Sequence, residues 1–481
     1  MIWWGLRRKL HSSWLVCIGC FCLLIGLLLA RDFAVSDVSI LFFGIIFVLV
    51  GLFRKNFYLI PAIIIGSVMI GLFRGSVVAQ DVLEIEKYYG KTLQIIGSVG
   101  SDVDTGTDGR LVIHLNNITI NNQNIAGTIW VSAENADIKR GDSLIISGKL
   151  TKGFGNFNGK IYQAKIMKII HPKPGDIARQ FRDWFVGLIK FSIPEPESSL
   201  GVGYLVGQKQ SLPADLVLAL QAAGLTHVVV ASGYNLTILV RLARRLFERI
   251  SKYLSILSAG LMIFCFIAIT GVSPSMSRAG LVASLSLLAW YYGRRFHPII
   301  LISIAMATTA MINPGYIWGD LGWQLSFAAF AGVMILAPLL SRFYFGDQKL
   351  GIVRQVLIET ISAQLLTAPI IIASFGQISN VAIITNLLVL PLVPLAMLFT
   401  FIAGIASAVV PFAATIISLP ATWLLGYMIN VVNYFAGLPW AVTIINIGFA
   451  GVVICYIVIA LAALYLSRVT KYNLRDVNLV E

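Results

Sequence analysis

The residues best suited to chemistry lie in one short segment, residues 224–237, in the apolar second half of the chain. Within it, His227 and Ser232 could act as a base and a nucleophile, and Asp320 could orient the base, as in serine hydrolases. However, Ser232 does not lie in the Gly-x-Ser-x-Gly sequence of a nucleophile elbow. The five-residue separation of His227 from Ser232 also turns the two side chains apart on a helix. These residues therefore disfavour a hydrolase.

The same segment is interrupted in a way that is typical of a membrane transport site. Four apolar residues follow His227, far fewer than the roughly 20 that cross a bilayer. Ser232 and Gly233 break the run, and Asn235 stands where it could cap a basic helix over residues 236–250. Non-helical backbone at membrane depth lines water-filled cavities, and broken helices surround many transport sites. We therefore expect a broken or re-entrant element beside a polar cavity.

Three further polar residues lie at the borders of apolar runs. Arg278 directly precedes an apolar stretch, so it is either a functional cation or a side chain that reaches the lipid headgroups. Asp320 and Gln324 are four residues apart and would share one face of a helix that begins at Gly319. They could pair with Arg278 or His227 inside a helix bundle, or serve structure alone. The candidate pathway residues are therefore His227, Ser232, Asn235, Arg278, Asp320 and Gln324.

Composition places most of the chain in a membrane. Of its 481 residues, 58% are hydrophobic and only 12% are charged, which excludes a water-soluble globule. The net charge of +14 favours a polyanionic partner, although basic loops that orient helices and meet lipid headgroups would give the same excess. The five cysteines all lie in apolar segments, and the histidines are scattered without ligand spacing. We expect no disulfide framework, no metal site and no cofactor.

The apolar runs predict a polytopic α-helical membrane protein with about ten crossings. Three spans come first, at residues 14–30, 38–53 and 57–73. Further candidates lie at residues 254–270, 279–292, 299–312, 321–340, 362–375, 381–410, 416–435 and 442–466. The basic residues before the first span, Arg7, Arg8 and Lys9, hold the N-terminus in the cytoplasm by the positive-inside rule. The third span should therefore end outside.

After the third span, short alternating segments predict five β-strands. They are residues 92–99, 110–120, 125–132, 142–150 and 160–170. About eighty residues of this kind favour a small extracytoplasmic barrel of the OB type, a fold that often binds single strands or sugars. Its best binding candidate is a basic and aromatic cluster, where rings could stack on bases and lysines meet phosphates. The cluster comprises Lys149, Lys152, Phe154, Phe157 and Lys160. An ordinary solvated turn would have the same composition.

A helix is predicted over residues 176–191, with apolar residues at helical spacing opposite a charged face. The apolar face comprises Ile177, Phe181, Trp184, Phe185 and Leu188, and the charged face comprises Arg179, Arg182 and Asp183. Such a helix either lies in the outer leaflet interface or docks against the β-domain.

Several short motifs follow one another in order along the second half of the chain. The first are Pro194-Glu195-Pro196-Glu197, Leu212-Pro213, and Ala223-Gly224-Leu225-Thr226-His227 followed by Ser232-Gly233. The later ones are Pro274 with Arg278-Ala279, Gln324-Leu325-Ser326-Phe327, Thr367 with Pro369, Phe375-Gly376-Gln377, and Asn386 with Pro391. This series resembles the ComEC family, inner-membrane channel proteins of bacterial competence. The resemblance covers nearly the whole chain, and the family also carries an extracytoplasmic OB-like domain after its first helices.

The resemblance implies transport of single-stranded transforming DNA across the bacterial cytoplasmic membrane. The implied partners are single-stranded DNA, membrane lipids, an extracytoplasmic DNA receptor, a cytoplasmic ATP-driven motor, a separate nuclease and, in a homo-oligomer, a second copy of the chain. Where the family usually shows Ser-Gly-Leu-His, this chain has Ser232-Gly233-Tyr234-Asn235. It also has no His-x-His-x-Asp-His cluster, so we expect a channel without nuclease or other enzyme activity. A transporter or flippase of an anionic lipid or glycan precursor would share the basic flanks and the broken helix.

The expected organisation has five parts. They are N-terminal membrane helices over residues 1–74, the OB-like β-domain over 75–174, the interfacial helix over 175–192, the membrane competence domain over 193–470 and a cytoplasmic tail over 471–481.

Overall fold

The computed structural model describes residues 12–54, 60–106, 109–134, 136–172, 175–208, 212–229, 233–271, 273–293, 297–346, 348 and 350–472. The predicted site residue Ser232 lies outside these ranges, as do Arg7, Arg8, Lys9 and most of the predicted tail. The chain forms two compact units, Met1–Asp176 with Ile299–Gln324, and Ile177–Pro298 with Leu325–Glu481. Each unit contains its own cluster of buried apolar side chains.

Seven helices in the described ranges are long and apolar enough to cross a membrane. They are Ile60–Glu86, Lys252–Thr270, Leu321–Phe345, Ile352–Phe375, Ala382–Val409, Pro411–Ala436 and Phe449–Thr470. Three shorter apolar helices are Ser13–Leu29, Val38–Phe53 and Pro298–Ile312. The fold is that of a polytopic helical membrane protein, as the sequence predicts.

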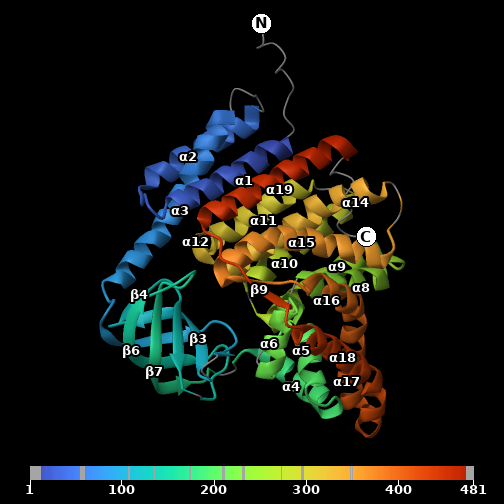
Figure 1. Cartoon of the computed structure of the whole chain (residues 1–481). Helices are drawn as coiled ribbons and strands as arrows, with labels where there is room; N and C mark the ends of the chain where they lie inside the picture. The colour runs from blue at the N-terminus through green and yellow to red at the C-terminus, as the bar shows by residue number, and fades with distance from the viewer. Residues whose placement is uncertain are drawn as a thin grey trace. The chain divides into compact units, whose positions relative to one another are not determined.

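The first unit begins with three apolar helices, α1 (Ser12–Leu29), α2 (Val38–Arg54) and α3 (Ile60–Glu86). α1 and α3 approach closely, because a Cβ on Gly26 or Gly71 would collide with the backbone of the other helix. Figure 1 shows α3 leading directly into the β-strands. The predicted span ends at residue 73, but the helix continues to Glu86. Polar residues end an apolar run without ending a helix, because helix propensity does not depend on hydrophobicity.

The β-strands of the first unit close into a small barrel. Five long strands, β1 (Thr92–Val99), β3 (Leu111–Ile120), β5 (Ile129–Ala133), β6 (Ser143–Lys152) and β7 (Gly159–Ile170), correspond to the predicted ones, and β2 (Asp104–Thr105) and β4 (Gln123–Ile125) are short additions. β1 pairs with both β3 and β6, while β5 joins β3 to β7 and β7 joins β6. Only the β5–β7 pair in this circle is parallel. The predicted strand over 125–132 is split into β4 and β5, since Gly127 between them has a φ of 129°.

Two further helices belong to the first unit, α11 (Pro298–Ile312) and α12 (Gly315–Gly319). Arg74 of α3 donates from Nε and Nη2 to the carbonyls of Met311 and Ile312, both at 3.0 Å, and so caps the end of α11. Trp318 of α12 donates from Nε1 to the carbonyl of Leu27 at 2.8 Å. The apolar helices of this unit are thus joined by side chains that satisfy helix-end carbonyls.

The other α-helices of the described ranges belong wholly or mostly to the second unit. They are α4 (Ile177–Ser192), α5 (Glu197–Val206), α6 (Ala214–Ala222), α7 (Thr226–Val229), α8 (Gly233–Glu248), α9 (Lys252–Thr270), α10 (Pro274–Tyr291), α13 (Leu321–Ala331), α14 (Ala337–Phe345), α15 (Ile352–Phe375), α16 (Ala382–Val389), α17 (Val393–Val409), α18 (Ala414–Ala436) and α19 (Phe449–Thr470). The predicted span over 442–466 is divided. Its first residues form β9 (Val442–Ile444), which pairs with β8 (Gln377–Ser379), and these β-branched residues favour a strand over a helix.

The helix predicted over residues 176–191 is α4, but its faces differ from the prediction. Arg182 is buried and donates from Nε to Asp183 at 3.1 Å, so it does not lie on a solvated face. Phe185 packs against Phe401 of α17, with 5.8 Å between ring centroids. An exposed stripe remains on α4, formed by Ile177, Phe181, Trp184 and Phe191. One apolar face of α4 therefore packs against α17, and another apolar face stays exposed. The packing on α17 covers only part of the apolar surface of the helix.

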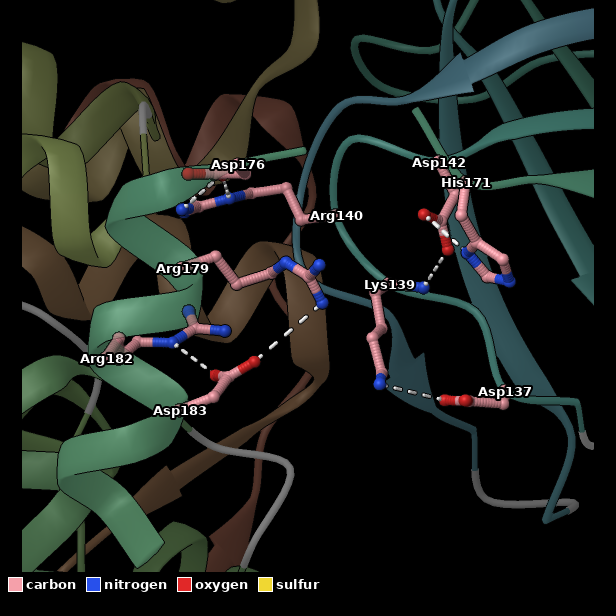
Figure 2. A network of polar contacts seen from close by, with 9 residues as sticks. All are labelled: Asp137, Lys139, Arg140, Asp142, His171, Asp176, Arg179, Arg182 and Asp183. Atoms are coloured by element: carbon pink, nitrogen blue, oxygen red, sulfur yellow. Dashed lines mark hydrogen bonds and ion pairs between the residues drawn. The ribbon is translucent and has the colours of Figure 1, made fainter. Parts of the chain in front are cut away.

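The β-domain ends in an ion pair between the buried Arg140 and the half-buried Asp176 (Figure 2). Arg140 donates from Nε and Nη2 to Asp176 Oδ2, each at 2.7 Å, and its side chain is 8% exposed. Beside it, the Asp142 carboxylate accepts from the amide of Lys139 at 2.8 Å and contacts His171 Nδ1 at 2.9 Å. These contacts hold the last residues of the β-domain against the 137–142 turn.

Substitution of Arg140 by alanine should loosen this end of the β-domain. A hydrogen bond to a charged group contributes about 2 kcal/mol, so we expect hydrogen exchange in residues 136–142 to accelerate by roughly 30-fold. The measurement is mass spectrometry of the full chain in detergent. Lys139→Ala is the control, because its ion pair with Asp137 is exposed and such pairs contribute no more than about 1 kcal/mol. Equal exchange rates in the two variants would contradict a structural role for Arg140.

Candidate nucleic-acid interface

The chain is interrupted around Gly224, as the sequence predicts. α6 ends at Ala222, the four-residue α7 follows, and α8 begins at Gly233. Gly224 has a φ of 73°, a conformation that favours glycine, and packs against Ala382. The hydroxyls of Ser379 and Thr385 donate to two carbonyls at the end of α6, at 2.6 and 2.7 Å. Side chains from the β8–α16 segment therefore satisfy the carbonyls that the broken helix leaves open.

The Gly224→Ala variant should fold poorly. Its added Cβ would lie 2.5 Å from Ala382, and the left-handed conformation costs a residue with a Cβ about 1–2 kcal/mol. We expect a lower thermal midpoint and less monodisperse protein in detergent, measured by size-exclusion chromatography after heating. Gly293→Ala is the matched control, because Gly293 also has a positive φ, 64°, but open space around it. If both variants lost the same amount of folded protein, the contact with Ala382 would have no role.

The polar residues of the interrupted segment have different surroundings. The His227 side chain on α7 is exposed. Asn235 is fully buried and donates from Nδ2 to the carbonyl of Tyr204 at 3.0 Å. The predicted capping role of Asn235 is wrong, because α8 begins two residues earlier, at Gly233, and the amide is turned toward α5.

Arg278 lies in the second turn of α10, whose first turn is capped by the Ser273 hydroxyl. Its Nη1 donates to the carbonyl of Ser326 at 2.6 Å. The guanidinium carbon lies 5.8 Å from the ring centroid of Phe327 and 5.6 Å from that of Phe330. A carbonyl and two aromatic rings from α13 thus hold the side chain inside the second unit. The alternative, a side chain that extends to the headgroups, does not fit these contacts.

The charge of Arg278 has no carboxylate partner in the part of the chain that the structure describes. Its Nε is buried and donates to no described partner. Its Nη2 adjoins Gly233, since a Cβ built there would lie 3.3 Å from that nitrogen. Gly233 is the first residue of α8, and the amides of a helix N-terminus carry partial positive charge. A cation beside a helix N-terminus favours an anion such as a phosphate group.

Asp320 and Gln324 do not share a helical face as predicted. Asp320 has an extended backbone between α12 and α13, and its Oδ1 accepts from the amide of Trp323 at 2.7 Å. An aspartate side chain that accepts backbone amides favours the cap of a helix over its interior. Burial raises the pKa of Asp320, although the capped amides oppose the shift. Both residues belong to the first unit, and the other described pathway candidates belong to the second.

The β-barrel carries an aromatic cluster on its outer surface, here named the stacking patch. The patch comprises His114, Trp130, Phe154, Phe157, Lys160 and Tyr162. Strand register places Trp130 of β5 between His114 of β3 and Lys160 of β7. The Trp130 ring lies 5.2 Å from Tyr162 and 5.8 Å from Phe154, and Lys160 Nζ lies 5.1 Å from the Tyr162 ring centroid. Phe154 and Tyr162 are 48% and 58% exposed, so their rings are open to stacking by a ligand.

The stacking patch includes three of the five residues predicted for the β-domain, Phe154, Phe157 and Lys160. Lys149 and Lys152 are exposed on β6, and no described contact joins them to the rings. Trp130 and Tyr162 also belong to the patch but were not among the predicted residues. The signal for them was alternation, because each follows a buried isoleucine in its strand and therefore faces outward.

His114 makes the stacking patch sensitive to acid. Its ring lies 4.8 Å from Phe157, its Nδ1 contacts Ser101 Oγ at 2.9 Å, and burial lowers its pKa below the ordinary value of about 6.5. The unfolded chain therefore binds more protons than the folded one below pH of about 6.5, so the barrel should lose stability as the pH falls.

This predicts faster hydrogen exchange in β3 and β5 of the full chain at pH about 5.5 than at pH about 7.5, after correction for intrinsic rates. The His114→Phe variant keeps a ring beside Phe157 and removes the titration. It should show a smaller difference between the two pH values. An unchanged difference would assign the effect to other groups.

Within the described ranges, no group of three His, Cys, Asp or Glu side chains is placed to hold a metal ion. The five cysteines are all free thiols.

Residues 204–469, over half of the chain, match the family model described as Competence protein. "ComE operon protein 3" of Bacillus subtilis (strain 168) is 26% identical over 214 residues, which cover 44% of this chain and 27% of that protein. The chain thus matches about a quarter of the length of this relative. No solved structure matches the chain. The family match includes the interrupted segment and Arg278 and excludes the β-barrel.

Proposed function

Since the chain belongs to the Competence protein family, we propose that it carries single-stranded DNA across the bacterial cytoplasmic membrane during natural transformation. The observation that carries this proposal is the guanidinium of Arg278 beside the first residue of α8, without a carboxylate partner among the described residues. A phosphate backbone that crosses a low-dielectric layer needs such groups along its path. The match to "ComE operon protein 3" supports the same role.

In this proposal, Arg278 and the N-terminal amides of α8 contact one phosphate at a time. The two phenylalanine rings beside Arg278 hold its side chain in place without neutralising its charge. A carboxylate would compete with phosphate, and a cluster of several cations would bind the strand too tightly to release it. His227 and Ser232 shape the narrow part of the path, and Asp320 and Gln324 set the start of α13.

We further propose that the β-barrel is an extracytoplasmic domain of the OB type that receives the strand. The closed strand order β1–β3–β5–β7–β6, with its single parallel β5–β7 pair, supports an OB-type barrel. The stacking patch supports single-strand binding, because bases of any sequence can stack on exposed rings. The basic residues before α1 favour an external position for the domain after α3.

The chain acts in this proposal as a channel and not as an enzyme. An extracytoplasmic receptor would deliver DNA, a separate nuclease would remove the other strand, and a cytoplasmic ATP-driven motor would pull the strand inward. Association of two or more copies would be compatible with the same path.

Reconstitution into vesicles tests the transport step directly. Vesicles that contain the protein are mixed with a fluorescent single strand, and the label protected from added nuclease is measured over time. We expect protection with protein and none with empty vesicles or with double-stranded DNA. If the protein moved a labelled anionic lipid between leaflets and left DNA outside, the chain would instead be a flippase.

A further inference from the structure

The outer face of α9 carries an apolar groove that the proposed DNA path does not use. The groove has a volume of about 490 Å³ and is lined by Tyr253, Ile256, Leu257, Gly260 and Leu261. These residues recur at helical spacing, so they share one face of a helix long enough to cross a membrane. No atom lies within 4 Å of a Cβ built on Gly260, which opens the groove at its centre. The groove is shallow and largely open to its surroundings.

Basic residues gather at the end of α9 where the groove begins. Lys252 is the first residue of α9, and Arg245 and Arg249 precede it on α8 and the connecting turn. All three side chains are exposed, and none forms an ion pair with any residue the structure describes. Arg244 differs, since it is buried and lies 4.0 Å from Glu248. The three exposed side chains therefore offer unneutralised positive charge.

Aromatic rings mark the depth of this end of the helix. Lys252 Nζ lies 5.7 Å from the ring centroid of Trp290 and 5.0 Å from that of Tyr291. Tyr253 packs edge-on against Tyr291 at 5.8 Å, and both Tyr253 and Tyr292 are more than two-thirds exposed. Trp and Tyr beside Lys are typical of the headgroup level of a bilayer. The rings thus favour a depth at which the cations meet lipid phosphates and the groove meets acyl chains.

We propose that this face of the second unit binds an anionic phospholipid. Its phosphate lies between Lys252 and Arg249, and one acyl chain lies along α9 over Gly260. An amphiphile would use both halves of the site, because its charged headgroup would contact the cations and its acyl chain would lie in the apolar groove. A free phosphate would leave the apolar groove unused, and a zwitterionic lipid would leave the three cations without a net counter-charge.

Native mass spectrometry of the full chain tests the proposal with dioleoylphosphatidylglycerol and dioleoylphosphatidylcholine as probes. The two lipids have the same acyl chains, so the comparison isolates the headgroup charge. We expect the phosphatidylglycerol adduct to survive at least about 25-fold better, the effect of two basic residues near an anionic surface. Glycerol 3-phosphate in excess should not displace it, because that anion lacks the acyl chain. Equal retention of the two lipids would overturn the proposal.

Two variants separate the parts of the site. Arg249→Gln with Lys252→Gln should lower phosphatidylglycerol retention by about 25-fold, and Gly260→Leu should lower retention of both lipids by filling the groove. Lys471→Gln, at the end of α19, and Gly351→Leu, in open space before α15, are the matched controls and should change nothing. Unchanged retention in the double variant would show an adventitious lipid only.

Photocrosslinking gives a measurement that does not depend on variants. A photoactivatable phosphatidylglycerol, activated in the native protein, should label the peptide over residues 252–261. Labelling spread evenly over the membrane helices would contradict a site at α9.

Discussion

Cells that carry the Arg278→Ala variant should take up labelled DNA at least about 30-fold more slowly than wild type, since loss of one partner of a desolvated charged contact costs about 2 kcal/mol or more. The guanidinium adjoins the first residue of α8 and has no carboxylate partner among the described residues, so it is available to a passing phosphate. The measurement is nuclease-protected label in a competent strain that lacks the chromosomal copy. DNA bound at the cell surface should not change, because the stacking patch lies on the β-barrel and not on α10.

Arg354→Ala is the matched control for this experiment. Arg354 also lies over a phenylalanine ring, 5.3 Å from the centroid of Phe345, but its side chain is exposed at the start of α15. We expect normal uptake from it. Arg278→Lys should restore part of the uptake, because lysine keeps the charge but not the planar fork of donors. Normal uptake by Arg278→Ala, at a wild-type level of protein in the membrane, would contradict the proposed role.

The double variant Trp130→Ala/Tyr162→Ala should bind single-stranded DNA about 100-fold more weakly, because each stack of a base on a ring contributes about 1–3 kcal/mol. The two rings lie 5.2 Å apart on the outer surface of β5 and β7, so successive bases can use both. The measurement is fluorescence anisotropy of a labelled oligothymidine with the full chain in detergent at fixed salt. Lys160 remains in this variant, so the salt dependence of the residual binding should persist.

Two further variants distinguish stacking from damage to the barrel. Met167→Ala removes an exposed apolar side chain from the same strand, β7, without removing a ring. Trp130→Phe with Tyr162→Phe keeps both rings. Both should bind within about threefold of wild type. Met167→Ala leaves both rings in place, and the phenylalanine variant keeps two π-faces on which bases can stack. A similar loss in Met167→Ala would assign the effect to the fold of β7.

Local pattern was enough to predict most elements of this chain. β1 has the predicted bounds, because Ile95 and its inward neighbours alternate with outward residues that are polar except for Ile96, at the period of a strand. The apolar runs predicted the membrane helices, since length and hydrophobicity decide whether a helix can span a bilayer. Prediction failed where an apolar run ends but the helix propensity of the following residues continues, as in the extension of α3 to Glu86. It also failed at Asp320, whose carboxylate caps α13 instead of sharing a helical face with Gln324.

The amino-acid sequence by itself determined the class of this protein: a helical membrane bundle with an inserted set of β-strands and an interruption near Gly224. These features depend on residues two to four positions apart, which sequence periodicity records. Only the tertiary structure decided which side chains meet. It brought Arg278 to the carbonyl of Ser326 and Trp130 to Tyr162, contacts between residues far apart in the chain. Such pairs arise from the packing of whole helices and strands, and no local spacing encodes them.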